Sequence, residues 1–256
     1  MLLDPKYDLT GKVAIVTGAG RGMGEATSKL LAAHGAIVNV NDIDRKRAER
    51  VATEIIQQDG TAVAMPADVA DYGQVFQMVE TVLKTYGRTD ILVNNAGILR
   101  RRASIEEISS DEWDLVFNVN AKGVFNCSKA VMRIMKQQQS GKIVNISSSA
   151  GRSTSELGGA HYTASKAAVL GLTRHFAREL APFNINVNAI CPGLIATEMI
   201  QESTTPEELE AERKQIPMGR FGTPEEEADL VLYLVSEASS YINGAIIDLN
   251  GASLLI

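Results

Sequence analysis

Cysteine and histidine are scarce in this sequence, and the few that occur are scattered. Its 256 residues include two cysteines, Cys127 and Cys191, neither of them in a Cys-x-x-Cys pattern. The three histidines, His34, His161 and His175, lie far apart in the chain. Metal sites gather several such ligands at short, characteristic spacings, so we expect two buried free thiols and no metal site.

Excess positive charge and long apolar runs are also lacking. The formal net charge is −6 and the isoelectric point is near 5.2, which leaves no basic surface for a nucleic acid or an anionic membrane. The longest convincing apolar run, residues 230–235, is too short to cross a bilayer, and residues 1–6 do not have the basic-then-apolar order of a signal peptide. The sequence therefore predicts a cytoplasmic protein without a nucleic-acid or membrane partner.

The chain does contain a regular alternation of short β-branched runs and longer amphipathic stretches. The predicted strands are residues 13–17, 36–41, 62–65, 91–94, 142–147, 185–190 and 245–249, and helical periodicity between them is clear over residues 25–34, 46–58 and 74–86. No proline-rich, serine-rich or charged stretch divides the chain. We therefore expect one domain over residues 1–256, an α/β Rossmann fold whose doubly wound parallel sheet of about seven strands carries helices on both faces.

Two further helix starts are marked near the C-terminal end. Thr205 and Thr223 are each followed by proline and then by two glutamates. A threonine cap, proline at the first helical position and glutamate at the third are typical of a helix N-terminus.

A glycine-rich loop follows the first predicted strand and precedes a helix. It reads Thr-Gly-Ala-Gly-Arg-Gly-Met-Gly over residues 17–24. Glycines let the backbone approach a pyrophosphate, and the helix N-terminus supplies amide groups and a positive dipole end. The strict G-x-G-x-x-G pattern fails at Met23, but the position after the first strand is where dinucleotide sites are built. The expected cofactor-binding residues in this loop are Gly18, Arg21, Gly22, Met23 and Gly24.

The ends of the next three strands carry further candidates. Asp42 follows the second strand, where a carboxylate binds the adenosine ribose hydroxyls and repels a 2′-phosphate, so NAD is favoured over NADP. Arg21 points the other way, because a guanidinium in this loop can meet a 2′-phosphate. The third strand is followed by Asp68 and Val69, and the fourth by Asn95, Ala96 and Gly97.

Tyr162 and Lys166 stand four positions apart, so on a helix their side chains share one face. A neighbouring ammonium favours the phenolate form of tyrosine. Moving the phenol pKa from about 10 to about 7 takes about 4 kcal/mol, which one charge about 4 Å away supplies at an effective dielectric of about 20. The pair by itself fits either an acid and base working near neutrality or a solvated tyrosine beside a surface lysine, and the surrounding motifs decide between the two.

In this order and spacing the motifs closely resemble those of the classical short-chain dehydrogenase/reductase family, from about Gly11 to Gly251. The matching motifs are Thr17-Gly18-x-x-x-Gly22-x-Gly24, Asn94-Asn95-Ala96-Gly97, a serine after the fifth strand, Tyr162-x-x-x-Lys166 and Pro192-Gly193. The resemblance implies that Tyr162 is the general acid or base, and that Lys166 binds the nicotinamide ribose and lowers the pKa of Tyr162. It further implies that Asn120 holds a water beside Lys166.

The same resemblance implies an adenine site near Asp68 and Val69 and a nicotinamide site near Pro192, Gly193, Ile195 and Thr197. The identity of the catalytic serine stays open between two positions. Alignment on Ala150-Gly151 selects Ser148, whereas the family's spacing to the tyrosine selects Ser149. We prefer Ser148, because a strand end defines direction better than a loop does.

A substrate lid is expected over residues 198–221, where the family caps its pocket. Met199, Ile200, Ile216 and Met218 are its possible apolar contacts. Around the pocket mouth, Arg100, Arg101 and Arg102 form either a solvated face or a site for a carboxylate, a phosphate or an acidic carrier protein. His161 and Glu156 are possible pocket-lining residues.

The predicted function is hydride transfer between NAD(H) and a secondary alcohol or its ketone, a small-molecule substrate. One alternative is a 3-oxoacyl thioester (acyl carrier protein) reductase that uses NADPH. Another, of a different class, is a dinucleotide-sensing protein without catalysis. The family resemblance also implies a homotetramer that pairs through residues 165–181 and 245–249.

Overall fold

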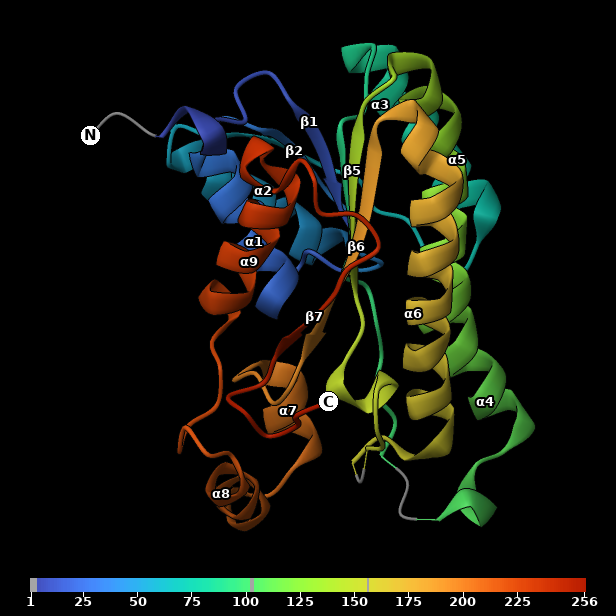
Figure 1. The fold of residues 1–256 in the computed structure, drawn as a ribbon, viewed down its shortest axis with the longest axis vertical. Helices are drawn as coiled ribbons and strands as arrows, with labels where there is room; N and C mark the ends of the chain where they lie inside the picture. The colour runs from blue at the N-terminus through green and yellow to red at the C-terminus, as the bar shows by residue number, and fades with distance from the viewer. Residues whose placement is uncertain (1–3, 102–103, 156) are drawn as a thin grey trace.

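The computed structural model describes residues 4–101, 104–155 and 157–256 and contains one parallel sheet of seven strands. The strand order is β3-β2-β1-β4-β5-β6-β7 (Figure 1). The strands are β1 (Val13–Val16), β2 (Ile37–Val40), β3 (Thr61–Ala64), β4 (Ile91–Asn94), β5 (Gly141–Ile146), β6 (Ile185–Pro192) and β7 (Ile246–Leu249). The order reverses at β1, which pairs with β2 on one side and β4 on the other. Ligands of open α/β sheets bind in the crevice at this reversal.

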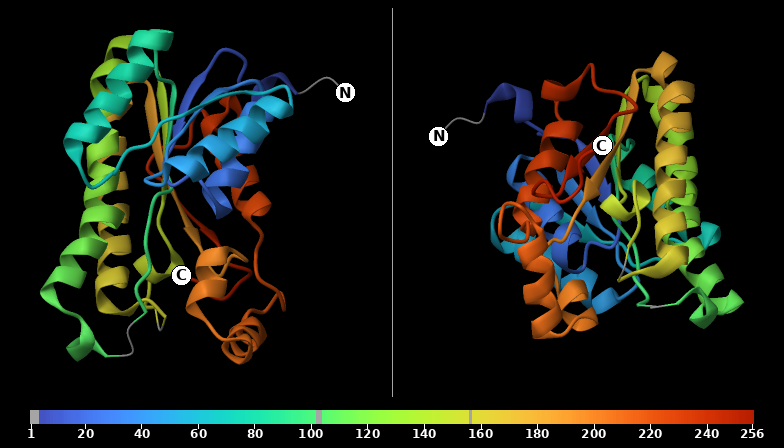
Figure 2. Two further views of the ribbon diagram at one scale, coloured as in Figure 1. Left: turned by 180° about the vertical axis from the view of Figure 1, so that it is seen from behind. Right: turned by 60° about the horizontal axis from the view of Figure 1, so that its bottom comes forward.

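Helices cover both faces of the sheet (Figures 1 and 2). They are α1 (Gly22–Ala33), α2 (Arg45–Gln57), α3 (Tyr72–Tyr86), α4 (Ser110–Phe117), α5 (Gly123–Gln138), α6 (Gly159–Leu180), α7 (Glu198–Ser203), α8 (Pro206–Gln215) and α9 (Pro224–Val235). One buried apolar cluster packs α1, α2 and α9 against the sheet, and a second packs α3, α5 and α6 against the other face. This arrangement confirms the predicted Rossmann fold.

The predicted strands are all found, with ends that move by one or two residues. The largest shift is in β6, which continues to Pro192 because Cys191 and Pro192 pair with Asp248 and Leu249 of β7. Strand ends depend on such ladder partners, which sequence alone does not reveal. Both cysteines are free and buried, as expected.

Helices α2, α3, α8 and α9 begin directly after residues whose side chains cap them. Asp44 and Asp71 accept backbone N–H groups at the starts of α2 and α3, so α3 begins at Tyr72, two residues earlier than its periodicity suggests. The capping boxes predicted at Thr205 and Thr223 are both present, with Glu208 and Glu226 as the reciprocal partners. Within the described residues, no helix is both long and apolar enough to span a membrane.

A buried carboxyl group joins the last long helix to the first. Glu227 of α9 is fully buried, and the hydroxyl of Thr27 on α1 donates a hydrogen bond of 3.1 Å to its Oε2. Its Oε1 has no hydrogen-bond partner. Burial raises the pKa of Glu227 to about 8, and the bond from Thr27 offsets only part of that rise. The folded protein therefore holds this carboxyl in its neutral form at pH 7.

We expect Glu227→Gln to remove a pH dependence of stability. The unfolded chain loses this proton above pH about 4.5, whereas the folded chain keeps it up to pH about 8. The stabilisation is thus complete at low pH and is lost as pH rises toward 8. The free energy of unfolding of Glu227→Gln, measured relative to wild type by urea denaturation, should increase by about 1.4 kcal/mol per pH unit between pH 5 and 8 and then level off. The matched control is the exposed Glu225→Gln, which should show no such slope; a flat difference for Glu227→Gln would contradict the assignment.

Candidate active site

The glycine loop packs directly against the segment that follows β4. The side-chain amide of Asn95 donates hydrogen bonds of 2.9 Å to the carbonyl oxygens of Thr17 and Gly18. In return, the Thr17 hydroxyl accepts from the backbone N–H groups of Asn95 and Ala96. A Cβ atom on Gly18 would lie 2.7 Å from Ala96 Cα, and one on Gly24 would lie 2.4 Å from Asn95 Nδ2. Only glycine allows the two segments this close.

The helix after this loop begins without a side-chain cap. Arg21 occupies the N-cap position of α1 and makes no capping hydrogen bond, unlike the aspartates that cap α2 and α3. Gly22 and Met23, in the first turn, line a cavity at the carboxyl ends of the strands. N–H groups in a first helical turn lack helical partners and carry partial positive charge. The loop therefore fits a pyrophosphate group.

The cavity has a volume of about 300 Å³ and runs across the switch point of the sheet. Every residue predicted to bind the cofactor lines it except Gly24, which is buried in the first turn of α1. The lining residues outside the predicted site and lid are Asn41, Ile43, Arg47, Ala67, Ile98, Leu99, Val119, Ile146 and Ser147. Most of them are near neighbours of motif residues, so extending each motif by a few positions would have found them.

Asp42 lies at the end of β2 with its carboxylate held against the glycine loop. Its Oδ2 accepts from the N–H of Gly20 at 2.9 Å, and its Oδ1 accepts from the N–H of Asp44 at 2.9 Å. A Cβ on Gly20 would lie 2.6 Å from Asp42 Oδ2. The carboxylate is therefore placed at one end of the cavity by two backbone donors.

Tyr162, Lys166 and Ser148 meet at the other end of the cavity. Tyr162 and Lys166 are both on α6, and Lys166 Nζ lies 5.8 Å from the centre of the tyrosine ring. The same ammonium donates a hydrogen bond of 2.9 Å to the carbonyl oxygen of Ile146, at the end of β5. The helix therefore presents the phenol and the ammonium to one space, as the four-residue spacing predicted.

The electrostatics differ from the expectation that lysine alone brings the phenol pKa near 7. Burial raises the pKa of Tyr162, and the hydrogen bond with Ser148 offsets only part of that effect. Burial also lowers the pKa of Lys166 to about 8. Both shifts arise because the interior disfavours ions. This cost opposes the attraction of about 4 kcal/mol from the lysine, and in this structure the phenol is neutral at pH 7.

The three consecutive serines after β5 have different surroundings. Ser147 donates to the carbonyl oxygen of Lys166 at 2.8 Å. Ser148 lines the cavity beside Tyr162, and its hydroxyl also accepts from the N–H of Ala150 at 3.1 Å. Ser149 begins a short 3-10 turn and is not among the cavity-lining residues. The structure thus places Ser148, rather than Ser149, next to the tyrosine.

Asn120 lies beside the lysine but does not line the cavity. It belongs to the π-helical turn Asn118–Lys122 between α4 and α5. Its Oδ1 accepts from the N–H of Ile98 at 2.8 Å, and its Nδ2 donates to the carbonyl oxygen of Ile98 and to Ser165 Oγ. A Cβ on Gly97 would lie 3.3 Å from Lys166 Nζ and 3.4 Å from Asn120 Oδ1. The asparagine side chain therefore holds the segment after β4 close to α6.

The interpretation of His161 as a pocket residue is wrong. Its side chain is fully buried, and its Nε2 lies 3.0 Å from Glu112 Oε1 of α4. On α6, the residue that precedes Tyr162 points to a different face, toward the neighbouring helix. Glu156, the other possible pocket residue of this loop, lies outside the described residues.

The arginines after β4 are only partly described. Arg101 forms an ion pair with Glu208 of α8, with Nη1 at 2.9 Å from Oε2. Arg100 and Arg101 line a shallow hollow beside the cavity mouth. Arg102 lies outside the described residues. In this structure, therefore, a carboxylate of the predicted lid already binds one of the guanidinium groups.

Comparison with known proteins gives matches over nearly the whole chain. The family described as Enoyl-(Acyl carrier protein) reductase matches residues 18–251. A 3-oxoacyl-(acyl-carrier-protein) reductase of Thermotoga maritima is 42% identical over 248 residues, which are 96% of this chain and 99% of the relative. One from Synechocystis is 41% identical over 249 residues, or 96% of this chain and 98% of the relative. An uncharacterized short-chain type dehydrogenase/reductase of Sinorhizobium fredii is 38% identical over 251 residues, or 96% and 99%.

These matches agree with the glycine loop at the switch point and with the tyrosine and lysine on one helix face. They confirm the resemblance drawn from the motifs. The chain belongs to the short-chain dehydrogenase/reductase family, whose members are oxidoreductases that use a nicotinamide cofactor.

Proposed function

We propose that this protein reduces 3-oxoacyl thioesters to 3-hydroxyacyl thioesters, with NADH as the hydride donor. Similar proteins from several bacteria are 3-oxoacyl-(acyl-carrier-protein) reductases, which favours this substrate over the broader class of secondary alcohols and ketones. The observation that carries the proposal is the pair of hydroxyl groups, Ser148 and Tyr162, at the inner end of the cavity. Two hydroxyl donors together suit a carbonyl oxygen that gains negative charge.

The cavity residues would hold the cofactor along the edge of the sheet. The glycine loop and the start of α1 would bind the pyrophosphate, and the Asp42 carboxylate would bind the adenosine ribose hydroxyls. Asp68 and Val69 would contact the adenine, and Lys166 the nicotinamide ribose. The nicotinamide would rest against the segment from Pro192 to Thr197 and, when bound, would supply the hydride.

The protein's own residues would supply the proton. Ser148 would donate a hydrogen bond to the substrate carbonyl oxygen, and Tyr162 would transfer its phenolic proton to that oxygen as the carbon accepts hydride. Because burial raises the pKa of Tyr162, the phenol carries its proton at pH 7 and is ready to act as an acid. This protonation state is the one that the proposed reduction requires.

A substrate panel tests this proposal. Absorbance at 340 nm is followed with NADH and NADPH against acetoacetyl-CoA, crotonyl-CoA and simple cyclic ketones. We expect the 3-oxoacyl thioester to give the highest kcat/KM, and NADH to be preferred because the Asp42 carboxylate repels a 2′-phosphate. Faster turnover of crotonyl-CoA would instead indicate reduction of a carbon–carbon double bond, and strong preference for NADPH would contradict the role given to Asp42.

Two other functions are separated by the same panel. A dehydrogenase for a small secondary alcohol would prefer the simple ketones, and the Asp42 carboxylate is equally compatible with it. A dinucleotide sensor would bind NADH and turn over none of the substrates. A sensor need not retain Ser148 and Tyr162 beside Lys166, so the presence of all three favours catalysis.

Tyr162→Phe should lower turnover by at least about a hundredfold while NADH binding stays near normal, because the variant loses only the transferable proton. Lys166→Ala should weaken NADH binding and turnover together. Stopped-flow or steady-state rates and calorimetric NADH titrations measure the two effects separately. Tyr241→Phe, at a fully exposed position, serves as the matched control. Near-normal turnover in Tyr162→Phe would refute the assignment.

The segment from residue 198 to residue 221, which contains α7 and α8, would form the substrate lid. It lies beyond the carboxyl ends of the strands (Figure 2), and Glu198 and Ile200 line the cavity. Ile216 is buried, whereas Met218 is largely exposed. The lid would therefore cover the reacting groups with a few apolar side chains on its inner side.

The exposed surface of α5 and α6 would be a contact between subunits. An apolar hollow on it is lined by Phe117, Asn118, Ala121, Lys122, Phe125, Ala168, Gly171 and Leu172. Phe125 is 41% exposed there. A contiguous apolar hollow between two long helices suits a second copy of the chain, as does β7, which is half-buried at the edge of the sheet.

We expect Phe125→Glu to reduce the size of the assembly, because it would place a charge in the centre of this apolar contact. Sedimentation velocity measures the change. The control is Phe76→Glu, which places the same charge at a comparably exposed phenylalanine of α3 outside the hollow. An unchanged sedimentation coefficient for Phe125→Glu, or a monomeric wild type, would exclude this surface as the contact.

A further inference from the structure

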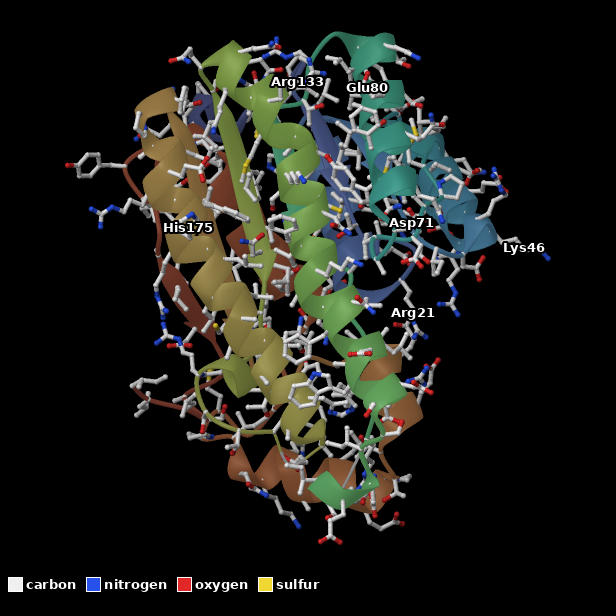
Figure 3. All side chains as sticks on the ribbon, turned by 90° about the vertical axis from the view of Figure 1, so that its right-hand side faces the viewer. Arg21, Lys46, Asp71, Glu80, Arg133 and His175 are labelled. Carbon is white, nitrogen blue, oxygen red and sulfur yellow. The ribbon has the colours of Figure 1, made fainter. Side chains whose placement is uncertain are left out.

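The predicted lid touches the glycine loop through an ion pair. Arg21, at the N-cap of α1, places its Nη1 2.8 Å from Oε1 of Glu202 on α7. Figure 3 shows Arg21 reaching away from the sheet, toward the ribbon of the lid. Behind this pair, a Cβ on Gly22 would lie 3.3 Å from the side chain of Thr197, just before α7. The start of the lid and the loop are therefore in close contact.

Arg21 stands where the adenosine end of a dinucleotide would lie. It lines the same cavity as Asp42 and directly follows Gly20, whose N–H donates to the Asp42 carboxylate. A guanidinium here is the natural partner for a phosphate on the ribose, because its donors match phosphate oxygens in pairs. In this structure the guanidinium of Arg21 instead binds the carboxylate of Glu202.

The other arginines close to the loop are paired in the same way. Arg50 binds Glu25 and Glu54 and donates to the carbonyl oxygen of Gly20. Arg47, which lines the cavity, lies 3.5 Å from Asp44. Of the three arginines, Arg21 is the one whose carboxylate comes from α7. The pairing of Arg21 therefore depends on a residue that is 181 positions away in the chain.

We propose that Glu202 is a specificity-determining residue for the cofactor: it binds Arg21 and so keeps that guanidinium from a 2′-phosphate. This inference rests on the proposed use of the cavity by NAD(H). Two carboxylates then act against NADP. Asp42 meets the ribose directly, and Glu202 withdraws and neutralises the one loop cation that would compensate for Asp42. A residue of the substrate lid thereby takes part in choosing the cofactor.

The size of the effect follows from exposure. The side chains of Arg21 and Glu202 are 31% and 61% exposed, so the ion pair is screened by water and salt. Exposed pairs of this kind change equilibria by a few fold rather than by orders of magnitude. Glu202 therefore adjusts a preference that Asp42 establishes.

The test is Glu202→Gln, which keeps the shape of the side chain and removes its charge. Dissociation constants for NADH and NADPH are measured by isothermal titration calorimetry at low salt, together with those of 5′-AMP and 2′,5′-ADP, which carry no nicotinamide. We expect NADPH and 2′,5′-ADP to bind about two- to fivefold more tightly to the variant than to wild type. The constants for NADH and 5′-AMP should change by less than those of their 2′-phosphorylated counterparts.

Two further variants distinguish an effect of Glu202 on Arg21 from a general loosening of the lid. Glu208→Gln breaks a second ion pair between lid and body, with Arg101, removes the same charge, and keeps a capping-box residue in place. It should leave the ratio of the NADPH and NADH constants unchanged. When Arg21→Gln is combined with Glu202→Gln, the gain in NADPH binding should disappear. Arg21→Gln should lower the affinity for NADPH less when Glu202 is present than when Glu202 is replaced by Gln.

An equal change for both cofactors in Glu202→Gln, or the same shift in ratio for Glu208→Gln, would overturn the role of Glu202. So would a gain that persists without Arg21. These results are independent of the substrate, because ligand binding is measured without turnover. A protein that binds NADH and shows the Glu202 effect but reduces no 3-oxoacyl thioester would refute the proposed substrate alone.

Discussion

The hydrogen bonds between Asn95 and the glycine loop are the constraint on which the site depends. They join the ends of β1 and β4, the two strands between which the sheet order reverses. With the loop held by a side-chain amide, glycines become necessary at Gly18 and Gly24, where any Cβ would collide with the opposing segment. The loop can then leave the first N–H groups of α1 uncapped at the cavity. Thus a motif that resembles a simple turn in the sequence supports the glycine loop that lines the cavity.

Burial sets the pKa values of Tyr162 and Lys166, which lie in the cavity beside Ser148. The same low dielectric that makes a hydrogen bond to a reacting oxygen effective also raises the pKa of Tyr162 and lowers that of Lys166. A neutral phenol next to a serine is a proton donor, which is what the proposed reduction requires. Near the glycine loop, two carboxylates act through charge: Asp42 accepts from the N–H of Gly20, and Glu202 pairs with Arg21. The proposed hydride chemistry and the proposed cofactor preference therefore depend on different physical effects within one cavity.

Much of the fold could be predicted because it depends on local patterns. The seven strands have the continuous apolar character of a sheet covered on both faces, and the Thr-Pro-Glu-Glu sequences at residues 205–208 and 223–226 carry complete capping chemistry. The ends of the strands could not be predicted in the same way. The last two residues of β6 belong to the strand only because they pair with β7. The local pattern shows that an element exists, and its partner determines where the element ends.

For the site, the sequence determined the residue types and their order: a glycine loop after the first strand, an acid after the second, and a tyrosine and lysine one helical turn apart. Only the tertiary structure decided between Ser148 and Ser149 as the neighbour of Tyr162, and it removed His161 from the cavity by burying it against Glu112. It also reversed the expected direction of the Tyr162 pKa and paired Arg21 with Glu202. The reason is the range of the forces. Spacing along the chain orients a side chain on its own element, whereas burial and charge pairing depend on atoms that long-range folding brings near.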